Sequence, residues 1–135
     1  HLVIVAAQFG LSTPSVFNQL DAGRASGLYP ASGELVEPAE LLSALSSYDG
    51  SEAALASLAP LLRNDLQAPA LSCAPQLEQT LNLRDSEGVY ASLVSGSGPT
   101  VLLLASSQDQ ADSLASSLRA TGNHAVSAVT VILYH

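Results

Sequence analysis

The 135 residues of this chain predict a single domain, and its core must be aliphatic because 47% of the residues are hydrophobic but only 4% are aromatic. The formal net charge is −8, with four arginines and no lysine. Nucleic acids and anionic membranes are bound by clustered cations, so the sequence argues against both as partners. The absence of lysine also excludes a Schiff-base lysine and a P-loop lysine within this chain.

The sequence contains no methionine and begins with His1, so we expect it to be part of a longer protein. A mature secreted protein would also lack the initiator methionine. However, Cys73 is the only cysteine, which favours a reducing compartment, and no segment resembles a signal peptide. The longest apolar runs are too short for the roughly 20 residues that span a bilayer. These features predict a cytoplasmic location.

The first third of the chain predicts a strand, a helix and a loop. Residues 2–7 form a continuous apolar run, which is typical of a strand buried on both faces. A helix then begins with Thr13 as its cap and Pro14 in its first turn, and Gly23 is the expected terminator. Its apolar stripe consists of Val16, Phe17 and Leu20. Residues 24–37 lack periodicity and predict a mobile loop.

The middle third predicts a layer of short helices separated by prolines. Pro38 opens the first, and Asp49 with Glu52 forms a capping pattern ahead of a helix over 53–58. Pro60 begins a third helix over 61–66, and Pro75 begins a fourth over 76–81. Four such short helices pack against another element rather than forming a bundle of their own.

The last third predicts two strands, a helix and a final strand. The strands cover 89–95 and 100–105, and a Gly-Ser-Gly-Pro segment separates them. Ser107 and Gln110 form a capping box for a helix whose apolar residues recur at helical spacing, and Gly122 ends it. Residues 126–133 supply the last strand. Four strands in this order predict an α+β, ferredoxin-like fold, with a four-stranded antiparallel sheet and helices on one face.

One segment has the composition of a ligand-binding loop: Ser95, Gly96, Ser97 and Gly98, followed by Pro99 and Thr100. Two glycines permit positive φ angles, and small neighbours let an anion approach the backbone N–H groups without any lysine. The alternative is a tight turn between strands. The segment is neither a Walker loop nor a nucleophile elbow, because both of those motifs lead into a helix.

Other candidate residues carry weaker signals. The three histidines have no partner at i, i+4 spacing, so we expect no metal site. A Ser-His-Asp triad stays open, but serine is so common here that any pairing can arise by chance. Asn64 and Asp65 are expected at a helix end, where a structural hydrogen bond is the favoured interpretation of both. Cys73 is expected to be a core or boundary residue.

Three ordered segments resemble a known family. Residues 10–17 (GLSTPSVF), 64–67 (NDLQ) and 95–100 (SGSGPT) are similar, in order and spacing, to the C-terminal half of the 4-diphosphocytidyl-2-C-methyl-D-erythritol kinases. These enzymes are GHMP kinases, and they transfer the ATP γ-phosphate to a hydroxyl of that substrate in the non-mevalonate route to isoprenoid precursors. The resemblance covers nearly the whole chain. Residues 7–8 depart from it, because relatives often carry proline or a Gly/Asp pair there.

The resemblance implies that residues 1–135 are the GHMP kinase C-terminal domain, without the N-terminal domain that carries the catalytic lysine and aspartate. No catalytic residue is then expected in this chain. Ser95, Gly96, Ser97 and Gly98 match the family's glycine-rich loop, which lies beside the phosphates of ATP. The parent protein is expected to be an ATP- and Mg-dependent, small-molecule kinase. This chain alone is expected to be inactive, to hold no cofactor, and to self-associate through the surface that its own N-terminal domain would cover.

Two alternatives remain at this stage. The chain can be a ferredoxin-like regulatory module that binds a small ligand, as ACT domains do. It can also be the C-terminal domain of another GHMP kinase, such as one acting on homoserine or mevalonate, because the glycine-rich loop is shared among them.

Overall fold

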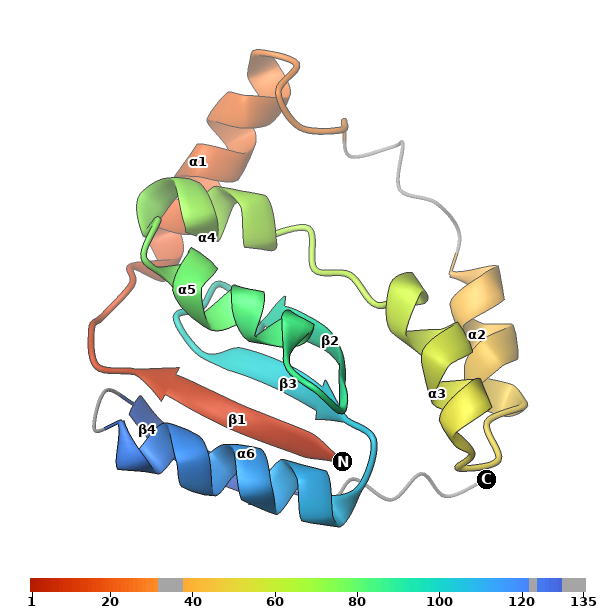
Figure 1. Cartoon of the computed structure of the whole chain (residues 1–135). Coiled ribbons are helices and arrows are strands. Elements are labelled where there is room, and N and C mark those ends of the chain that lie inside the picture. Colours follow the sequence, from red (N-terminus) through yellow and green to blue (C-terminus); the bar gives the residue numbers. More distant parts are fainter. Residues whose placement is uncertain (32–37, 122–123, 130–135) are drawn as a thin grey trace.

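The computed structural model describes residues 1–31, 38–121 and 124–129, and four strands in these ranges form one sheet (Figure 1). The strand order is β2-β3-β1-β4, and every neighbouring pair is antiparallel. The bounds are Leu2–Ala7 (β1), Val89–Val94 (β2), Val101–Ala105 (β3) and His124–Val129 (β4). This order and direction confirm the predicted ferredoxin-like, four-stranded antiparallel sheet.

The helical segments between β1 and β2, and the helix between β3 and β4, complete the element order that the sequence predicts. The α-helices are Thr13–Ala25 (α1), Ala39–Ser46 (α2), Glu52–Leu58 (α3), Gln67–Cys73 (α4), Leu77–Leu81 (α5) and Gln108–Ala120 (α6). Two 3₁₀ segments, Ala59–Leu61 (η1) and Asn82–Asp85 (η2), follow α3 and α5. The predicted loop over 24–37 and the predicted stop at Gly122 lie partly or wholly outside the described residues, as does the end of the strand predicted over 126–133.

In β1 and β3 only one face is buried, and α5 and α6 cover this face of the sheet (Figure 1). Val3 and Val5 of β1 and Leu103 of β3 are at most 1% exposed, whereas Leu2, Ile4, Leu102 and Leu104 on the other face are half-buried. The prediction that β1 is buried on both faces is therefore wrong. An antiparallel sheet needs helices on one face only, and here the helices provide that cover. The core combines one strand face with apolar residues of the helices: Val16, Ala70, Leu77, Leu81, Ala111, Ala115 and Leu118.

Helix α1 begins one residue earlier than its sequence suggests. Ser12 is the N-cap, and its Oγ accepts a hydrogen bond from the N–H of Ser15 at 3.4 Å. Thr13 is therefore the first helical residue, and its hydroxyl is available for a contact outside the helix. Val16 and Leu20 are buried as predicted, but Phe17 is 47% exposed and lies outside the apolar stripe.

Gly23 lies inside α1 rather than at its end. The helix continues to Ala25, and Gly27 supplies the left-handed residue beyond it, with φ of +74°. Gly23 is buried because the ring of Tyr29 folds back over it, and the Tyr29 hydroxyl reaches Ser72 Oγ of α4 at 2.9 Å. A methyl group at position 23 would lie 2.1 Å from Tyr29 Cδ2. The glycine is required for close packing, not for chain reversal.

The helix predicted over 61–66 does not form. The chain becomes extended at Leu62, and α4 begins only at Gln67. Asn64 explains the difference, because its side-chain oxygen accepts the N–H of Leu66 at 3.0 Å and so competes with helical hydrogen bonding. Helix α4 was not predicted because it contains Pro69, and proline usually interrupts a helix. Pro69 lies in the first turn of α4, where proline is tolerated.

The other helix starts follow the sequence more closely. Ser51, not Asp49, caps α3, and Asp49 Oδ1 instead accepts the N–H of Ser51 at 2.9 Å. The hydrogen bonds from Ser51 hold the pKa of Asp49 below its usual value. Ser107 caps α6 as predicted, accepting the N–H of Gln110 at 3.2 Å. None of the described helices combines the length and the apolar character needed to cross a membrane.

We expect Gly23→Ala to lower the free energy of unfolding by roughly 1–3 kcal/mol, because the added methyl displaces the Tyr29 ring from α1. Urea unfolding followed by circular dichroism measures this change. Gly10→Ala is the matched control, since a methyl group there has no neighbour within 4 Å. Equal stability of the Gly23 variant and the wild type would contradict the packing role of this glycine.

Candidate functional site

The three segments that carry the sequence resemblance meet at one end of the sheet. They are the start of α1, the connection into α4, and the loop between β2 and β3, which lie side by side in Figure 1. Residues up to 84 positions apart in sequence are thus in direct contact. The convergence identifies the β2–β3 loop as the candidate functional site.

The loop itself is a tight turn held by two backbone hydrogen bonds. The N–H of Ser95 donates to the carbonyl of Thr100 at 2.8 Å, and the N–H of Gly98 donates to the carbonyl of Ser95 at 2.9 Å. Gly96 and Gly98 have φ angles of +57° and +81°, which favour glycine, and the Gly98–Pro99 peptide bond is cis. The N–H groups of Gly96 and Ser97 donate to no other group in the described part of the chain. The segment is therefore a tight turn that also presents free donors.

The two glycines of the loop have different surroundings. Gly96 is exposed, and a methyl group there would meet nothing within 4 Å. At Gly98 a methyl group would lie 3.1 Å from Val94 Cγ1 and 3.3 Å from Leu11 Cδ2. Gly98 thus packs on the core side, whereas Gly96 leaves space in front of the loop.

The start of α1 reaches the tip of the loop. Thr13 Oγ1 and Ser97 Oγ are 2.8 Å apart and share a hydrogen bond. Because Thr13 is the first residue of a 13-residue helix, the positive end of the helix dipole lies beside the loop. Hydroxyl groups, free N–H groups and a helix N-terminus together favour an anion, and phosphate is the usual ligand of such an arrangement.

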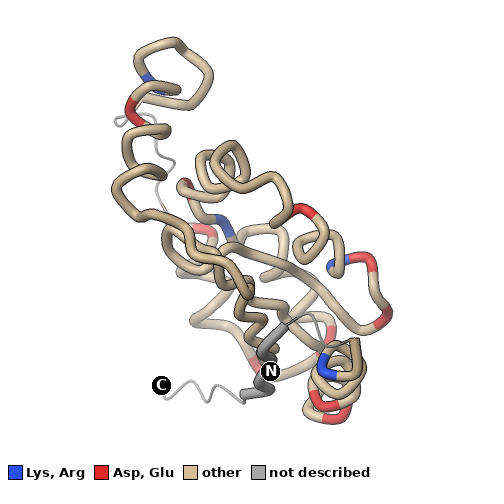
Figure 2. Tube along the Cα trace, turned by 90° about the vertical axis from the view of Figure 1, so that its left-hand side faces the viewer, with Lys and Arg blue, Asp and Glu red and all other residues tan. Residues whose placement is uncertain are grey.

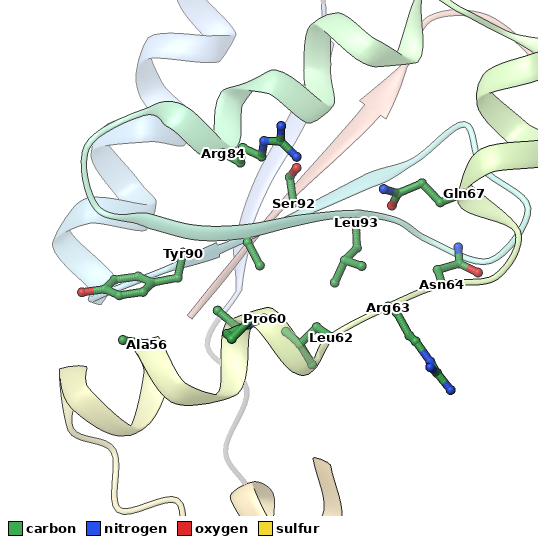
Figure 3. Close-up of a pocket in the computed structure, with 12 residues that line it drawn as sticks. Ala56, Pro60, Leu62, Arg63, Asn64, Gln67, Arg84, Tyr90, Ser92 and Leu93 are labelled. Carbon is green, nitrogen blue, oxygen red and sulfur yellow. The ribbon is translucent and has the colours of Figure 1, made fainter. Parts of the chain in front are cut away.

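On the opposite side, Asn64 contacts the loop and Gln67 contacts the end of β2 that precedes it (Figure 3). Asn64 Nδ2 donates to the carbonyls of Val94 and Gly96, each at 2.7 Å, and Gln67 Oε1 accepts the N–H of Val94 at 3.0 Å. Asn64 thus makes the structural hydrogen bonds expected of it, but its expected place at a helix end is wrong. Asp65 is exposed in the same connection and is not at a helix C-terminus.

A pocket of about 580 Å³ lies beside the edge strand β2, between this strand and the α3–η1 segment (Figure 3). Tyr90 closes one end of it and donates a hydrogen bond to Glu52 of α3. That bond is the main reason that the pKa of Tyr90 lies above its usual value, and burial and the charge of Glu52 raise it further. The phenol is thus neutral at physiological pH and links α3 to the sheet.

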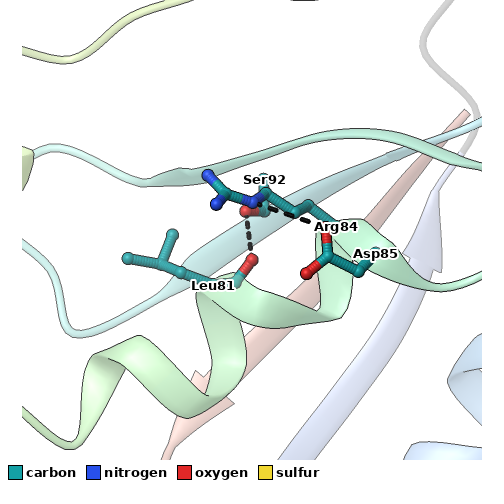
Figure 4. A network of polar contacts seen from close by, with 4 residues as sticks. All are labelled: Leu81, Arg84, Asp85 and Ser92. Carbon is teal, nitrogen blue, oxygen red and sulfur yellow. Dashed lines mark hydrogen bonds and ion pairs between the residues drawn. The ribbon is translucent and has the colours of Figure 1, made fainter.

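The arginines do not gather at the loop. Arg84 forms a 3.7 Å ion pair with its neighbour Asp85, and both side chains are more than half exposed (Figure 4). Ser92, which lies beside them, donates to the carbonyl of Leu81 at 2.5 Å. Figure 2 shows the arginines on separate parts of the trace, and two of them, Arg63 and Arg84, line the pocket beside β2. An anion at the loop would be held by N–H and hydroxyl groups.

The remaining sequence candidates lie apart from the loop. Among the described residues, no group of three or more His, Cys, Asp or Glu side chains could hold a metal ion. His1 Nδ1 lies 3.2 Å from Gln108 Oε1 at the far end of β1. Cys73 is exposed rather than part of the core, with Sγ 3.8 Å from the carbonyl of Ser15.

Sequence reasoning missed Ser12, Gln67 and the Thr13–Ser97 contact. Ser12 was not identified as the N-cap because serine, threonine and proline follow one another at the helix start, and the sequence does not show which of them begins the first turn. Gln67 carries no local signal, because its partner Val94 is 27 residues away. An edge strand needs partners for its outer backbone groups, so a polar side chain able to reach the end of such a strand was the signal that could have indicated Gln67.

Comparisons with known proteins agree on one family. Residues 41–124 match the family described as GHMP kinases C terminal. The chain is 46% identical over 122 residues to a 4-diphosphocytidyl-2-C-methyl-D-erythritol kinase of Nocardia farcinica, covering 90% of this chain and 37% of that protein. It is 45% identical over 130 residues to a kinase of the same name from an Arthrobacter species, covering 96% of this chain and 38% of that protein.

A solved structure shares the fold. A crystal structure of 4-(cytidine 5'-diphospho)-2C-methyl-D-erythritol kinase matches with a TM-score of 0.65 and 25% identity, over 93% of this chain and 41% of that one. This chain therefore spans well under half the length of the relatives it matches. The family match covers more than half of the chain and includes Asn64 and the glycine-rich loop. The chain belongs to the GHMP kinase C-terminal family.

Proposed function

We propose that this chain is the C-terminal domain of a longer, cytoplasmic kinase that transfers the γ-phosphate of ATP to a hydroxyl of 4-diphosphocytidyl-2-C-methyl-D-erythritol, in non-mevalonate isoprenoid precursor biosynthesis. Its share of the task is a glycine-rich loop, Ser95–Gly98, placed against the nucleotide phosphates. The observation that carries the proposal is the convergence of Thr13, Asn64 and this loop at one site. The names of relatives that are 40–46% identical support this choice of substrate.

The loop fits a phosphate group but not a metal ion. It offers the N–H groups of Gly96 and Ser97, with open space in front of Gly96. Mg²⁺ prefers carboxylate and phosphate oxygens, and the residues that build this site supply hydroxyl and amide groups instead. We therefore propose that Ser95–Gly98 contact ATP, and that any Mg²⁺ is held by the nucleotide and by the remainder of the longer protein.

The chain is not expected to act alone. Phosphoryl transfer depends on positioning and on cationic stabilisation of the transferred group. With no lysine, four arginines and a net charge of −8, this domain is a poor source of the cations that such stabilisation needs. Its place is one wall of a cleft whose catalytic side belongs to another part of the longer protein.

The open face of the sheet supports a contact with that other part. Leu2 pairs with Leu104, Ile4 with Leu102, and Leu102 with Leu93 on the face opposite the core. These half-buried side chains make a continuous apolar surface, which we call the open sheet face. We propose that the rest of the longer protein packs here, and that a second copy takes its place when the chain is isolated.

The kinase proposal is tested by comparing the longer protein with the 135-residue chain. We expect the longer protein to consume ATP only when 4-diphosphocytidyl-2-C-methyl-D-erythritol is present, and the chain alone to give no turnover. Isothermal titration should detect no tight binding of ATP to the isolated chain. Turnover or stoichiometric ATP binding by the chain alone would contradict the proposal that catalysis needs the rest of the longer protein. If the longer protein phosphorylates homoserine or mevalonate instead, it is a different GHMP kinase from the one proposed.

The two loop glycines should separate catalysis from stability in the longer protein. Gly96→Ala adds a methyl group to the open space in front of the loop, so we expect a loss in kcat/KM for ATP at a cost of about 1–2 kcal/mol in stability. Gly98→Ala causes a similar backbone strain and, in addition, a close contact with Val94. It should therefore lower the melting temperature more than Gly96→Ala does. Steady-state kinetics and thermal unfolding measure both. If Gly96→Ala alters stability only, the loop is merely a turn.

Self-association of the isolated chain is tested by sedimentation velocity. We expect a species larger than a monomer, and we expect Ile4→Asn with Leu102→Asn to shift it to the monomer because both changes fall on the open sheet face. Asn replacement of the exposed Leu42 on α2 is the control, and it should leave the distribution unchanged. A monomeric wild type would refute this role of the open sheet face.

A further inference from the structure

Asn64 uses every hydrogen-bonding group of its side-chain amide. Both hydrogens of Nδ2 are donated, one to the carbonyl of Val94 and one to the carbonyl of Gly96, at 2.7 Å each. Its Oδ1 accepts the N–H of Leu66 at 3.0 Å. One neutral side chain thus joins the α4 connection, the end of β2 and the glycine-rich loop.

The contact between Asn64 and the carbonyl of Gly96 also sets the direction of the Ser97 N–H, which Asn64 does not touch. The Gly96–Ser97 peptide is trans and planar, so its N–H points in the direction opposite to its C=O. Because Asn64 holds the carbonyl of Gly96, the N–H of Ser97 is directed away from Asn64. The hydrogen bond between Ser97 Oγ and Thr13 fixes the side chain of the same residue.

Glycine at position 96 makes such a restraint necessary. Without a Cβ, this residue can rotate the following peptide at little cost. A rotated peptide would present the carbonyl oxygen of Gly96, in place of the N–H of Ser97, to the ligand. A carbonyl dipole repels phosphate, whereas an N–H group attracts it. In a chain without lysine, this orientation matters more than it would beside a cationic side chain.

We propose that Asn64 is a positioning residue that aims the N–H of Ser97 at the phosphate chain of the nucleotide. The inference rests on the proposed function for the identity of the ligand, but not for the orientation of the peptide. Gln67, the neighbouring amide side chain, does not share this positioning role. It accepts the N–H of Val94 at 3.0 Å and so secures the end of β2, while the contact with Gly96 belongs to Asn64.

Asn64→Asp in the longer protein is the sharpest test. The aspartate can still accept the N–H of Leu66, but it loses both donors and repels the carbonyls of Val94 and Gly96. We expect kcat/KM for ATP to fall roughly ten- to a hundredfold, the range for losing a hydrogen bond to a charged group. The KM for the alcohol substrate should change by less than about twofold, because that substrate does not contact Ser97 in this proposal.

Two further variants separate positioning from structural or charge effects. Gln67→Ala loosens the end of β2 without touching Gly96, so we expect a lower melting temperature and kcat/KM for ATP within about threefold of wild type. Asn18→Asp makes the same chemical change at an exposed position of α1 and controls for the added charge. Equal losses of kcat/KM in the Asn64 and Gln67 variants, or none in either, would overturn the inference.

A readout without catalysis keeps the two proposals distinguishable. In the ¹⁵N-labelled longer protein, adding ATP should shift the Ser97 amide resonance in the wild type and in Gln67→Ala, but not in Asn64→Asp. If the wild type lacks kinase activity yet shows this pattern, the proposed reaction fails and the role of Asn64 stands. If the wild type is active and the Ser97 resonance responds to ATP equally in all three proteins, Asn64 does not position this group.

Discussion

The edge position of β2 is the constraint on which the site depends. An edge strand has backbone groups that no neighbouring strand pairs, and at Val94 both its N–H and its carbonyl are directed outward. Asn64 and Gln67 satisfy them with side-chain amides, in the way that another strand would. This requirement draws the connection between η1 and α4 against the end of the sheet. The glycine-rich loop begins at the same point, so the amide that completes the strand is also able to restrain the loop.

The chemistry of the site suits the charge of the chain. In the proposed function, a domain with a net charge of −8 and no lysine attracts phosphate through oriented N–H groups, hydroxyls and a helix N-terminus. Such groups act only when their direction is held, and hydrogen bonds with Thr13 and Asn64 restrain the loop. In the proposed function another part of the longer protein supplies the cationic stabilisation, and this chain spans 37% of the length of one matched kinase.

Much of the architecture followed from local patterns. The strands at 2–7, 89–95 and 100–105 and the helix opened by Ser107 were predictable, because their signals lie within a few residues of one another. The failures arose where contacts beyond the local pattern decided the structure. The helix predicted over 61–66 is absent because Asn64 bonds to Leu66 and to the sheet, and the second of these interactions spans 30 residues. Gly23 was mistaken for a helix terminator because the ring that packs on it cannot be placed from its own neighbourhood.

By itself, the sequence determined the order of the elements and the antiparallel sheet with helices on one face, and it indicated the glycine-rich loop as the candidate site for a ligand. These depend on hydrophobic periodicity, capping residues and glycine content, which act over short stretches of chain. The tertiary structure decided which side chains complete the site. Thr13 and Asn64 have ordinary local roles as a first-turn residue and a turn former, and only folding brings them to Ser97 and Gly96. Hydrogen bonds between residues 32 and 84 positions apart leave no local pattern, because their geometry arises from the packing of the whole sheet and its helices.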